Sequence, residues 1–353
     1  MNTSNSSINT RIVLRDYMPK GVTSASYFSV DESQEAPSPD SLVDGQVLVK
    51  VFALSIDPHL RIYISASEDL PSLADPGLLY PLGKTFSSIG VRTVIASRSN
   101  KFCVGDRIRG SELPWQKLAV LNDGSIEKLP SDASVSLQDY LGVLGMPSFT
   151  AYLGVVTVGK AKAGETLLVS AASGAVGQVV VQLAKARGLR VIGVAGSDEK
   201  TARVKSIGAD AVINYKTCGD YAQAIKEVAQ EGIDIYFDSV GGSFLDAALL
   251  NLNNGARVVL CGSMTTFGAD KSATDGIKNL DSLIVKEVTM KGLFYLPHIG
   301  TQAEADFIQE TTGMVSQGLI DFKIDERVGL ENAPQALVDL YEGKNFGKVI
   351  VRL

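Results

Sequence analysis

The sequence predicts an α/β protein in which a doubly wound parallel Rossmann sheet follows a β-rich N-terminal domain. Three observations lead to this prediction: a strand–helix alternation from residue 145 onward, a glycine-rich turn at 171–177, and strand-like segments without alternation before residue 145. Strand–helix–strand units of about 20 to 30 residues imply parallel pairing with right-handed crossovers. At 353 residues the chain is longer than one typical core, so two domains are expected.

The expected domains are a β-rich substrate domain over residues 1–144, a dinucleotide-binding domain over 145–325, and a return of the chain to the first domain over 326–353. In the first domain, segments 46–56 and 89–95 are rich in β-branched residues and are bounded by Gly and Pro, as strands are. We therefore expect both segments to form strands.

The second domain is expected to alternate between strands that read as buried and helices with apolar residues at helical spacing. The expected strands are 165–172, 189–195, 211–215, 233–240 and 256–262, and the expected helices are 176–188, 197–208, 222–230 and 243–252. Ser197 is expected to be an N-cap and Gly188 to follow a helix end. Towards the C-terminus we expect a helix near 302–317, a strand near 321–327, a helix near 332–342 and a last strand over 348–353.

Composition excludes several classes of function. The net charge is −6 and no block of Lys and Arg is long enough to indicate binding to nucleic acid or an anionic membrane. No apolar run reaches the roughly 18 to 20 residues that span a bilayer, and the N-terminus lacks the pattern of a signal peptide. The three cysteines are far apart, which argues against a disulfide framework and favours a reducing, cytoplasmic location.

The glycine turn is the first candidate site. Residues Gly174, Ala175, Val176 and Gly177 lie between an expected strand and an expected helix, with Ala172 in the first slot of a G-x-G-x-x-G pattern. Gly174 lets backbone approach a pyrophosphate, and Gly177 allows close packing of helix on strand. The helix N-terminus supplies N–H donors and partial positive charge to phosphates. The turn is therefore expected to bind a dinucleotide.

The end of the second strand indicates which nicotinamide cofactor is bound. An NAD site needs Asp or Glu there, but this chain has Ala195 and Gly196. Ser197 and Lys200 follow on the first helical turn, and Tyr215 ends the next strand nearby. A small pocket with a hydroxyl and an ammonium suits a phosphate, so we expect NADPH (NADP⁺) to be the cofactor.

The chain resembles the zinc-free medium-chain dehydrogenase/reductases, and among them the NADPH-dependent alkenal and enone double-bond reductases, a group that includes the prostaglandin reductases. The resemblance covers nearly the whole chain. It rests on SIDPHLR (55–61), GMPSFTAYLGV (145–155), AASGAVGQVV (171–180), AGSDEK (195–200), INYK (213–216), FDSVGG (237–242), CGSMTTF (261–267) and GKNFGKVIV (343–351). It implies that the N-terminal domain is GroES-like. It also implies that the cofactor groove is completed by Ser239, Cys261, Phe267, Phe294, Leu296 and Asn345.

Two residues depart from the pattern of this group. His59 stands where members usually carry Tyr in a DPY motif, and Phe267 stands where they commonly carry a Tyr that is credited with a hydrogen bond near the substrate. The zinc-dependent relatives place Cys and Gly-His-Glu at positions that here are Ile56–Asp57 and Gly83–Thr85, and no cysteine cluster is present. We therefore expect no metal site.

The resemblance implies hydride transfer to the β-carbon of a conjugated C=C bond, with a hydrogen-bond donor at the carbonyl oxygen. His59 is the first candidate for that donor because of its motif position near the expected substrate cleft. The other candidates are Tyr63, Tyr80, Tyr295 and His298. Trp115 and Phe267 indicate either an apolar cleft or core.

Two other functions stay open at this point. A quinone reductase shares the zinc-free framework and could use the same groove, and a non-catalytic NADPH-binding protein would retain the cofactor site alone. The replacements at positions 59 and 267 keep the latter open. The expected partners are a small molecule with a conjugated carbonyl and a second copy of the chain, which would form a homodimer through a sheet edge near residues 285–296.

Overall fold

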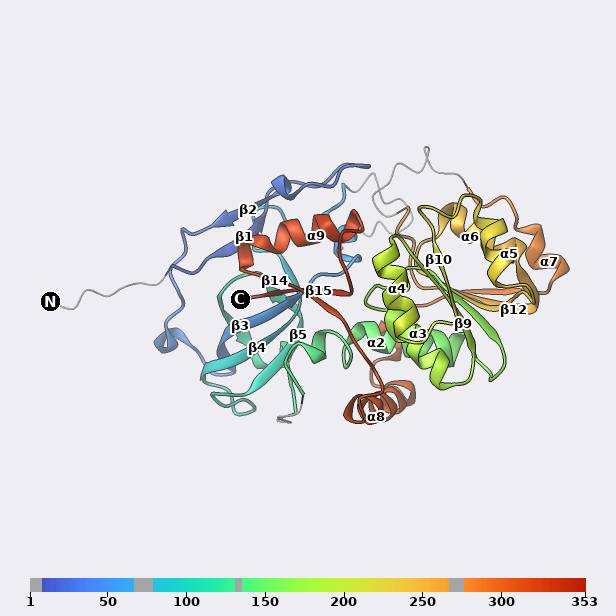
Figure 1. The fold of residues 1–353 in the computed structure, drawn as a ribbon. Coiled ribbons are helices and arrows are strands. Elements are labelled where there is room, and N and C mark those ends of the chain that lie inside the picture. The colour runs from blue at the N-terminus through green and yellow to red at the C-terminus, as the bar shows by residue number, and fades with distance from the viewer. Residues whose placement is uncertain (1–7, 67–78, 131–134, 267–275) are drawn as a thin grey trace. The chain divides into compact units, whose positions relative to one another are not determined.

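A computed structural model of the chain describes residues 8–66, 79–130, 135–266 and 276–353 (Figure 1). The fold divides into two compact units. Unit 1 comprises Met1–Leu141, Asp325–Lys344 and Val349–Leu353, and unit 2 comprises Gly142–Ile324 and Asn345–Lys348. Within the described residues, no helix is both long and apolar enough to cross a bilayer.

Unit 2 is built on a six-stranded parallel sheet with the strand order β10-β9-β8-β11-β12-β13. Its strands are β8 (Thr166–Val169), β9 (Arg190–Ala195), β10 (Ala211–Asn214), β11 (Ile233–Asp238), β12 (Leu252–Leu260) and β13 (Thr289–Gly292). The first strand, β8, is central. The chain runs outward through β9 and β10, then returns to β11, which pairs with the other side of β8. The doubly wound parallel sheet is thereby confirmed, and the reversal of strand order falls between β8 and β11.

Helices cover both faces of this sheet because successive strand residues point to opposite sides. The helices are α2 (Met146–Tyr152), α3 (Gly177–Ala186), α4 (Asp198–Ser206), α5 (Tyr221–Val228), α6 (Gly242–Leu250), α7 (Asp281–Val285) and α8 (Gln302–Ser316). Leu167 and Val169 of β8 pack in a core with α2, α3, α4 and α8, whereas Leu168 packs in a second core with α5 and α6.

Unit 1 is the β-rich part of the chain. Its larger sheet has the order β14-β15-β3-β4-β5-β7, with β6 also paired to β3, and β1 and β2 form a separate pair. The elements are β1 (Arg11–Leu14), β2 (Phe28–Asp31), β3 (Gln46–Ser55), α1 (Leu60–Ile64), β4 (Ser87–Ser97), β5 (Arg107–Pro114), β6 (Leu118–Asn122), β7 (Glu127–Lys128), β14 (Ile324–Val328), α9 (Ala333–Tyr341) and β15 (Lys348–Arg352). The expected return of the C-terminus is seen in β15, which pairs antiparallel with β3.

Trp115 belongs to the core of unit 1 and not to a cleft. Its side chain is fully buried against Phe28 and Phe86, and its indole N–H donates to Ser88 Oγ at 2.8 Å. A buried Trp needs such a partner for its N–H group. The position of Trp115 therefore says nothing about a substrate.

Three details differ from the expectations. Helix α3 begins at Gly177, after Val176 as N-cap, one residue later than expected. Strand β14 begins at Ile324, because the amides of residues 321 and 323 bond to side chains of α3 and not to a strand. The short elements α7 and β13 have too few residues for their periodicity to be recognised in the sequence.

Candidate functional site

The glycine turn connects the carboxyl end of β8 to α3. Ala171 has a positive φ of 49°, which turns the chain, and the amide of Ala172 donates to Val194 O at 2.9 Å, which holds the turn to β9. A Cβ on Gly177 would lie 2.7 Å from the Cα of Ala172, closer than real Cβ atoms approach backbone. Gly177 is therefore needed for the close approach of helix and strand, as the sequence predicted.

The N-terminus of α3 is open to a ligand. The amides of Val176 and Gly177 donate to no acceptor within the described ranges, and the first turn has neither an acidic residue nor a capping side chain. The neighbouring helices differ, because Ser197 caps α4 and Asp220 caps α5. Unpaired N–H groups at a helix N-terminus favour an anion. The end of α3 therefore fits the diphosphate of a dinucleotide.

A second polar site lies where β9 and β10 end. The ring of Tyr215 lies over Gly196, so that a Cβ on Gly196 would be 2.7 Å from the tyrosine hydroxyl. Ser197 Oγ accepts from the amide of Lys200 at 3.2 Å, as the predicted N-cap does, and its O–H hydrogen stays available as a donor. The structure thus brings Gly196, Ser197, Tyr215 and the backbone of Lys200 together at the ends of β9 and β10.

Two carboxylates share the first turn of α4 with Lys200. Asp198 accepts a 2.8 Å hydrogen bond from the side chain of Asn214, and Glu199 is exposed. Both complement the partial positive charge of the helix N-terminus. The first turn of α4 thus carries charges of both signs beside Ser197.

Ser239 and Cys261 lie at the carboxyl ends of β11 and β12. The amide of Ser239 donates to Ser170 Oγ at 2.8 Å, and the amide of Cys261 donates to Asp238 O at 2.7 Å. Burial raises the pKa of the Cys261 thiol to about 12, and the nearby Asp238 carboxylate acts in the same direction. The thiol is therefore protonated at neutral pH and is not a nucleophile.

The remaining residues predicted for the groove are placed as follows. Asn345 donates from Nδ2 to Gly347 O at 3.1 Å, and Gly347 forms a bridge with Gly174, so Asn345 lies close to the glycine turn. Phe294 and Leu296 follow β13 with exposed side chains. Phe267 lies outside the described residues.

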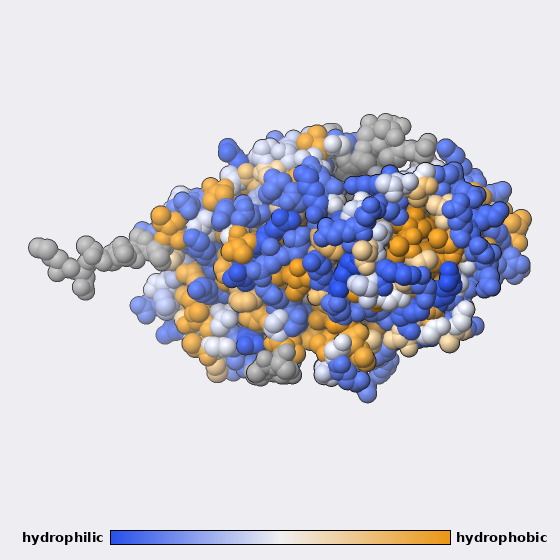
Figure 2. All heavy atoms as spheres, in the orientation of Figure 1, coloured by the Kyte–Doolittle hydropathy of each residue, from blue (hydrophilic) through white to orange (hydrophobic). Residues whose placement is uncertain are grey.

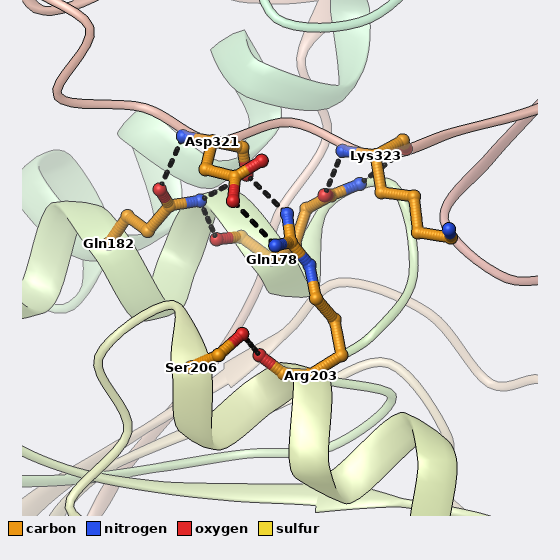
Figure 3. Close-up of polar contacts among 6 residues, drawn as sticks. All are labelled: Gln178, Gln182, Arg203, Ser206, Asp321 and Lys323. Carbon is orange, nitrogen blue, oxygen red and sulfur yellow. Dashed lines mark hydrogen bonds and ion pairs between the residues drawn. The ribbon is translucent and has the colours of Figure 1, made fainter.

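Figure 3 shows how α3 holds the segment before β14. Gln182 accepts from the amide of Asp321 at 2.7 Å and donates to its carbonyl at 3.0 Å. Gln178 does the same for Lys323, at 2.7 and 3.1 Å. Arg203 of α4 adds an ion pair to Asp321 at 2.5 Å. The two helices that flank the candidate phosphate sites are therefore tied to one segment.

His59 lies in unit 1 as the N-cap of α1, and its surroundings hold the loop in place. Ser55 Oγ donates to the buried Asp57, and the hydroxyl of Tyr341 donates to the carbonyl of Pro58. The imidazole is partly buried and meets the ring of Tyr63 edge-on, with the ring centroids 5.9 Å apart. These contacts give His59 a defined orientation.

Among the other candidate donors, Tyr80 already donates its hydroxyl to Thr85 O at 2.6 Å. Burial raises the pKa of both Tyr63 and Tyr80, and Glu112 acts in the same direction, so both stay protonated at neutral pH. His298 and Tyr295 are both partly exposed.

Four polar residues in unit 2 escaped the sequence analysis: Ser170, Gln178, Gln182 and Asp238. Gln178 and Gln182 are buried four residues apart on a helix whose only other polar side chain is Lys185, and this spacing was the available signal. Asp238 ends a buried apolar strand and precedes a Gly-Gly pair, and packing of an apolar core does not call for a carboxylate at that position. No group of three or more His, Cys, Asp or Glu side chains in the described part of the chain could hold a metal ion.

Comparisons with known proteins agree with this geometry. A family model described as "N-terminal domain of oxidoreductase" matches residues 11–129, and one described as "Zinc-binding dehydrogenase" matches residues 175–310. The chain is 35% identical to (+)-pulegone reductase of Mentha piperita over 98% of both chains. It is 37% identical to the NADP(+)-dependent 2-alkenal reductase of Nicotiana tabacum over 86% of both.

A solved structure is also similar along nearly the whole chain. It is CurA from Vibrio vulnificus in complex with NADPH, with a TM-score of 0.87, 36% identity, and coverage of 97% of this chain and 98% of the other. The chain therefore belongs to the medium-chain dehydrogenase/reductase superfamily and, within it, to the group of alkenal and enone reductases.

Proposed function

We propose that the protein is an NADPH-dependent oxidoreductase that reduces the C=C bond of α,β-unsaturated ketones and aldehydes. The open N-terminus of α3 at the strand-order reversal carries the proposal, because it fits a diphosphate. The relatives support the substrate class, since one is named a pulegone reductase and another a 2-alkenal reductase.

The proposed roles of the residues follow from their positions. The backbone of Gly174–Gly177 holds the diphosphate, and Lys200, Ser197 and Tyr215 hold the 2′-phosphate. The groove continues along Ser239 and Cys261. Bound NADPH supplies the hydride. A side chain such as His59 donates a hydrogen bond to the carbonyl oxygen of the substrate and so stabilises the negative charge that develops on that oxygen.

We expect His59→Phe to lower kcat for an enone about a hundredfold, because one donor to a developing oxyanion contributes roughly that much. Phe keeps the ring that faces Tyr63, so the affinity for NADPH should stay within about twofold of the wild type. Stopped-flow kinetics and calorimetry with NADPH measure the two quantities. An unchanged kcat would show that His59 is not the donor. If kcat falls in His298→Phe instead, His298 would be assigned the role.

A substrate panel separates the proposed function from the alternatives. Oxidation of NADPH by enones but not by quinones supports the proposal, whereas the reverse pattern indicates a quinone reductase. Binding of NADPH without turnover of either class indicates a non-catalytic protein. The same assay after dialysis against a chelator tests the predicted independence from zinc.

We further propose that two copies associate through the β13 edge of the sheet. Strand β13 pairs only with β12 among the described residues, so its outer N–H and C=O groups face no strand. On α7, just before it, the side chains of Ile284 and Val285 are 79% and 76% exposed. Figure 2 shows hydrophobic atoms at the right-hand end of the molecule, where Figure 1 places α7. A second copy of the same edge would cover both features.

We expect Ile284→Glu to shift the protein from dimer to monomer in sedimentation velocity at micromolar concentration, because it places a charge in the apolar contact. Val104→Glu is the matched control, since Val104 is also exposed but lies in a turn of unit 1. A wild-type protein that sediments as a monomer would refute the dimer.

We also propose a cytoplasmic location, since the described cysteines are all unpaired.

A further inference from the structure

Asp238, at the carboxyl end of β11, is a fully buried carboxylate whose partners are all uncharged. Its Oδ1 accepts from the hydroxyl of Tyr236 at 2.7 Å, from Ser170 Oγ at 3.2 Å, and from the amides of Val240 and Gly241 at 3.0 Å each. Its Oδ2 accepts from Gly241 N at 3.1 Å. A buried carboxylate is tolerated only with such a set of donors.

These bonds fix the loop between β11 and α6. Gly241 and Gly242 both have positive φ, of 72° and 59°, so the loop follows a path that few other residues can adopt. The Asp238 carboxylate binds the amides that make this turn. Ser170 then ties the same loop to the end of β8, because its hydroxyl donates to Asp238 and accepts from Ser239 N at 2.8 Å.

A second loop, residues 261–266, is built on the first. The amides of Cys261 and Gly262 donate to Asp238 O at 2.7 and 3.2 Å. Further along, Thr265 donates to Val240 O from both its amide, at 3.1 Å, and its hydroxyl, at 2.7 Å. The position of the second loop therefore depends on the first, and both depend on the carboxyl group of Asp238.

The topology indicates which half of NADPH these loops meet. A dinucleotide lies across the point where strand order reverses, with one nucleotide on each side. The site around Gly196 and Lys200 lies on the β9–β10 side and fits the 2′-phosphate of the adenosine half. The loops that Asp238 fixes lie on the β11–β12 side. They therefore face the nicotinamide half.

We infer that Asp238 is a positioning residue for the nicotinamide half of NADPH, acting together with Ser170 through the loops at residues 239–242 and 261–266. This inference rests on binding of NADPH, but not on the identity of the reduced substrate. Asp238 would then contribute to the affinity for the nicotinamide half of the cofactor and not to that for the adenosine half.

The test compares two ligands in folded variants. Asp238→Asn keeps the shape but removes the negative charge and puts an NH₂ group in the place of Oδ2, which cannot accept from the amide of Gly241. Ser170→Ala removes the hydroxyl that links the loop to the end of β8 and leaves the Asp238 carboxylate in place. We expect each to weaken NADPH binding about tenfold, measured by titration calorimetry, while adenosine 2′,5′-bisphosphate binds as to wild type.

Tyr236→Phe is the matched control, because it removes a buried hydrogen bond to the same carboxylate but none to a loop amide. We expect it to lower the melting temperature and to leave both affinities within about twofold of wild type. If Asp238→Asn does not fold, the binding of the two ligands to Ser170→Ala tests the inference by itself. Wild-type affinity for NADPH in the folded variants would overturn the inference. So would an equal loss for both ligands, or the same loss in Tyr236→Phe. None of these outcomes depends on the enone assay.

Discussion

Gly177→Ala is expected to abolish detectable binding of NADPH and to lower the melting temperature by several degrees. The added Cβ would meet the backbone of Ala171 and Ala172, with the Cα of Ala172 only 2.7 Å away. Backbone cannot move aside as a side chain can, so α3 must shift from β8, at a cost of about 1–3 kcal/mol or more. The same shift displaces the open amides of Val176 and Gly177. Differential scanning fluorimetry and calorimetry with NADPH measure both effects.

Gly174→Ala serves as the control for this prediction. A Cβ there would meet only the Ala171 carbonyl, at 3.1 Å, so we expect a melting temperature close to that of wild type. The affinity for NADPH should still fall, because the Cβ obstructs the approach of the diphosphate to the turn. Equal melting temperatures for wild type and Gly177→Ala would contradict the packing role of Gly177.

Lys200→Ala is expected to weaken NADPH binding between about tenfold and a hundredfold, as the loss of a charge-assisted hydrogen bond to phosphate does. NADH lacks the 2′-phosphate, so its affinity should change by less than about twofold. KM for the two cofactors, or their dissociation constants, gives the comparison. The specificity of the enzyme would then move towards NADH without any change at the nicotinamide.

Lys205→Ala removes the same charge from the last turn of the same helix and is the matched control. It tests whether a general loss of positive charge explains the effect, in which case both variants would weaken NADPH binding alike. An equal loss of affinity for NADPH and NADH in Lys200→Ala would refute the assignment of Lys200 to the 2′-phosphate. Salt dependence should be weaker for Lys200→Ala than for wild type.

The Rossmann sheet was predictable from the sequence because its signals are local. Each of the strands β8 to β11 is followed by a helix of 8 to 10 residues, and the ends carry their own markers, such as Ser197 as N-cap and Gly188 with a positive φ of 76° after α3. The turn at Gly174–Gly177 combines a strand, glycines and a helix in one short segment. The fold class therefore follows from neighbouring residues alone.

Features that depend on distant contacts could not be predicted in this way. Trp115 has no local sign of being core, and its burial comes from Phe28 and Phe86. Asp238 binds Ser170 across 68 residues of sequence. The clusters around Lys200 and the glycine turn were predicted, but the loops that Asp238 fixes were assigned only through single residues such as Ser239 and Cys261.

The two glutamines of α3 have a consequence for how the chain tolerates change. Four residues of helix rise about 6 Å, and two residues of extended chain span about 6.6 Å, so side chains at 178 and 182 match the backbone at 323 and 321. The glutamines bind peptide groups, so these two contacts do not depend on which side chains the stretch carries, although Asp321 also pairs with Arg203. The contacts do depend on the length of the stretch, because adding or deleting one residue between Asp321 and Lys323 would move both amides away from the glutamines.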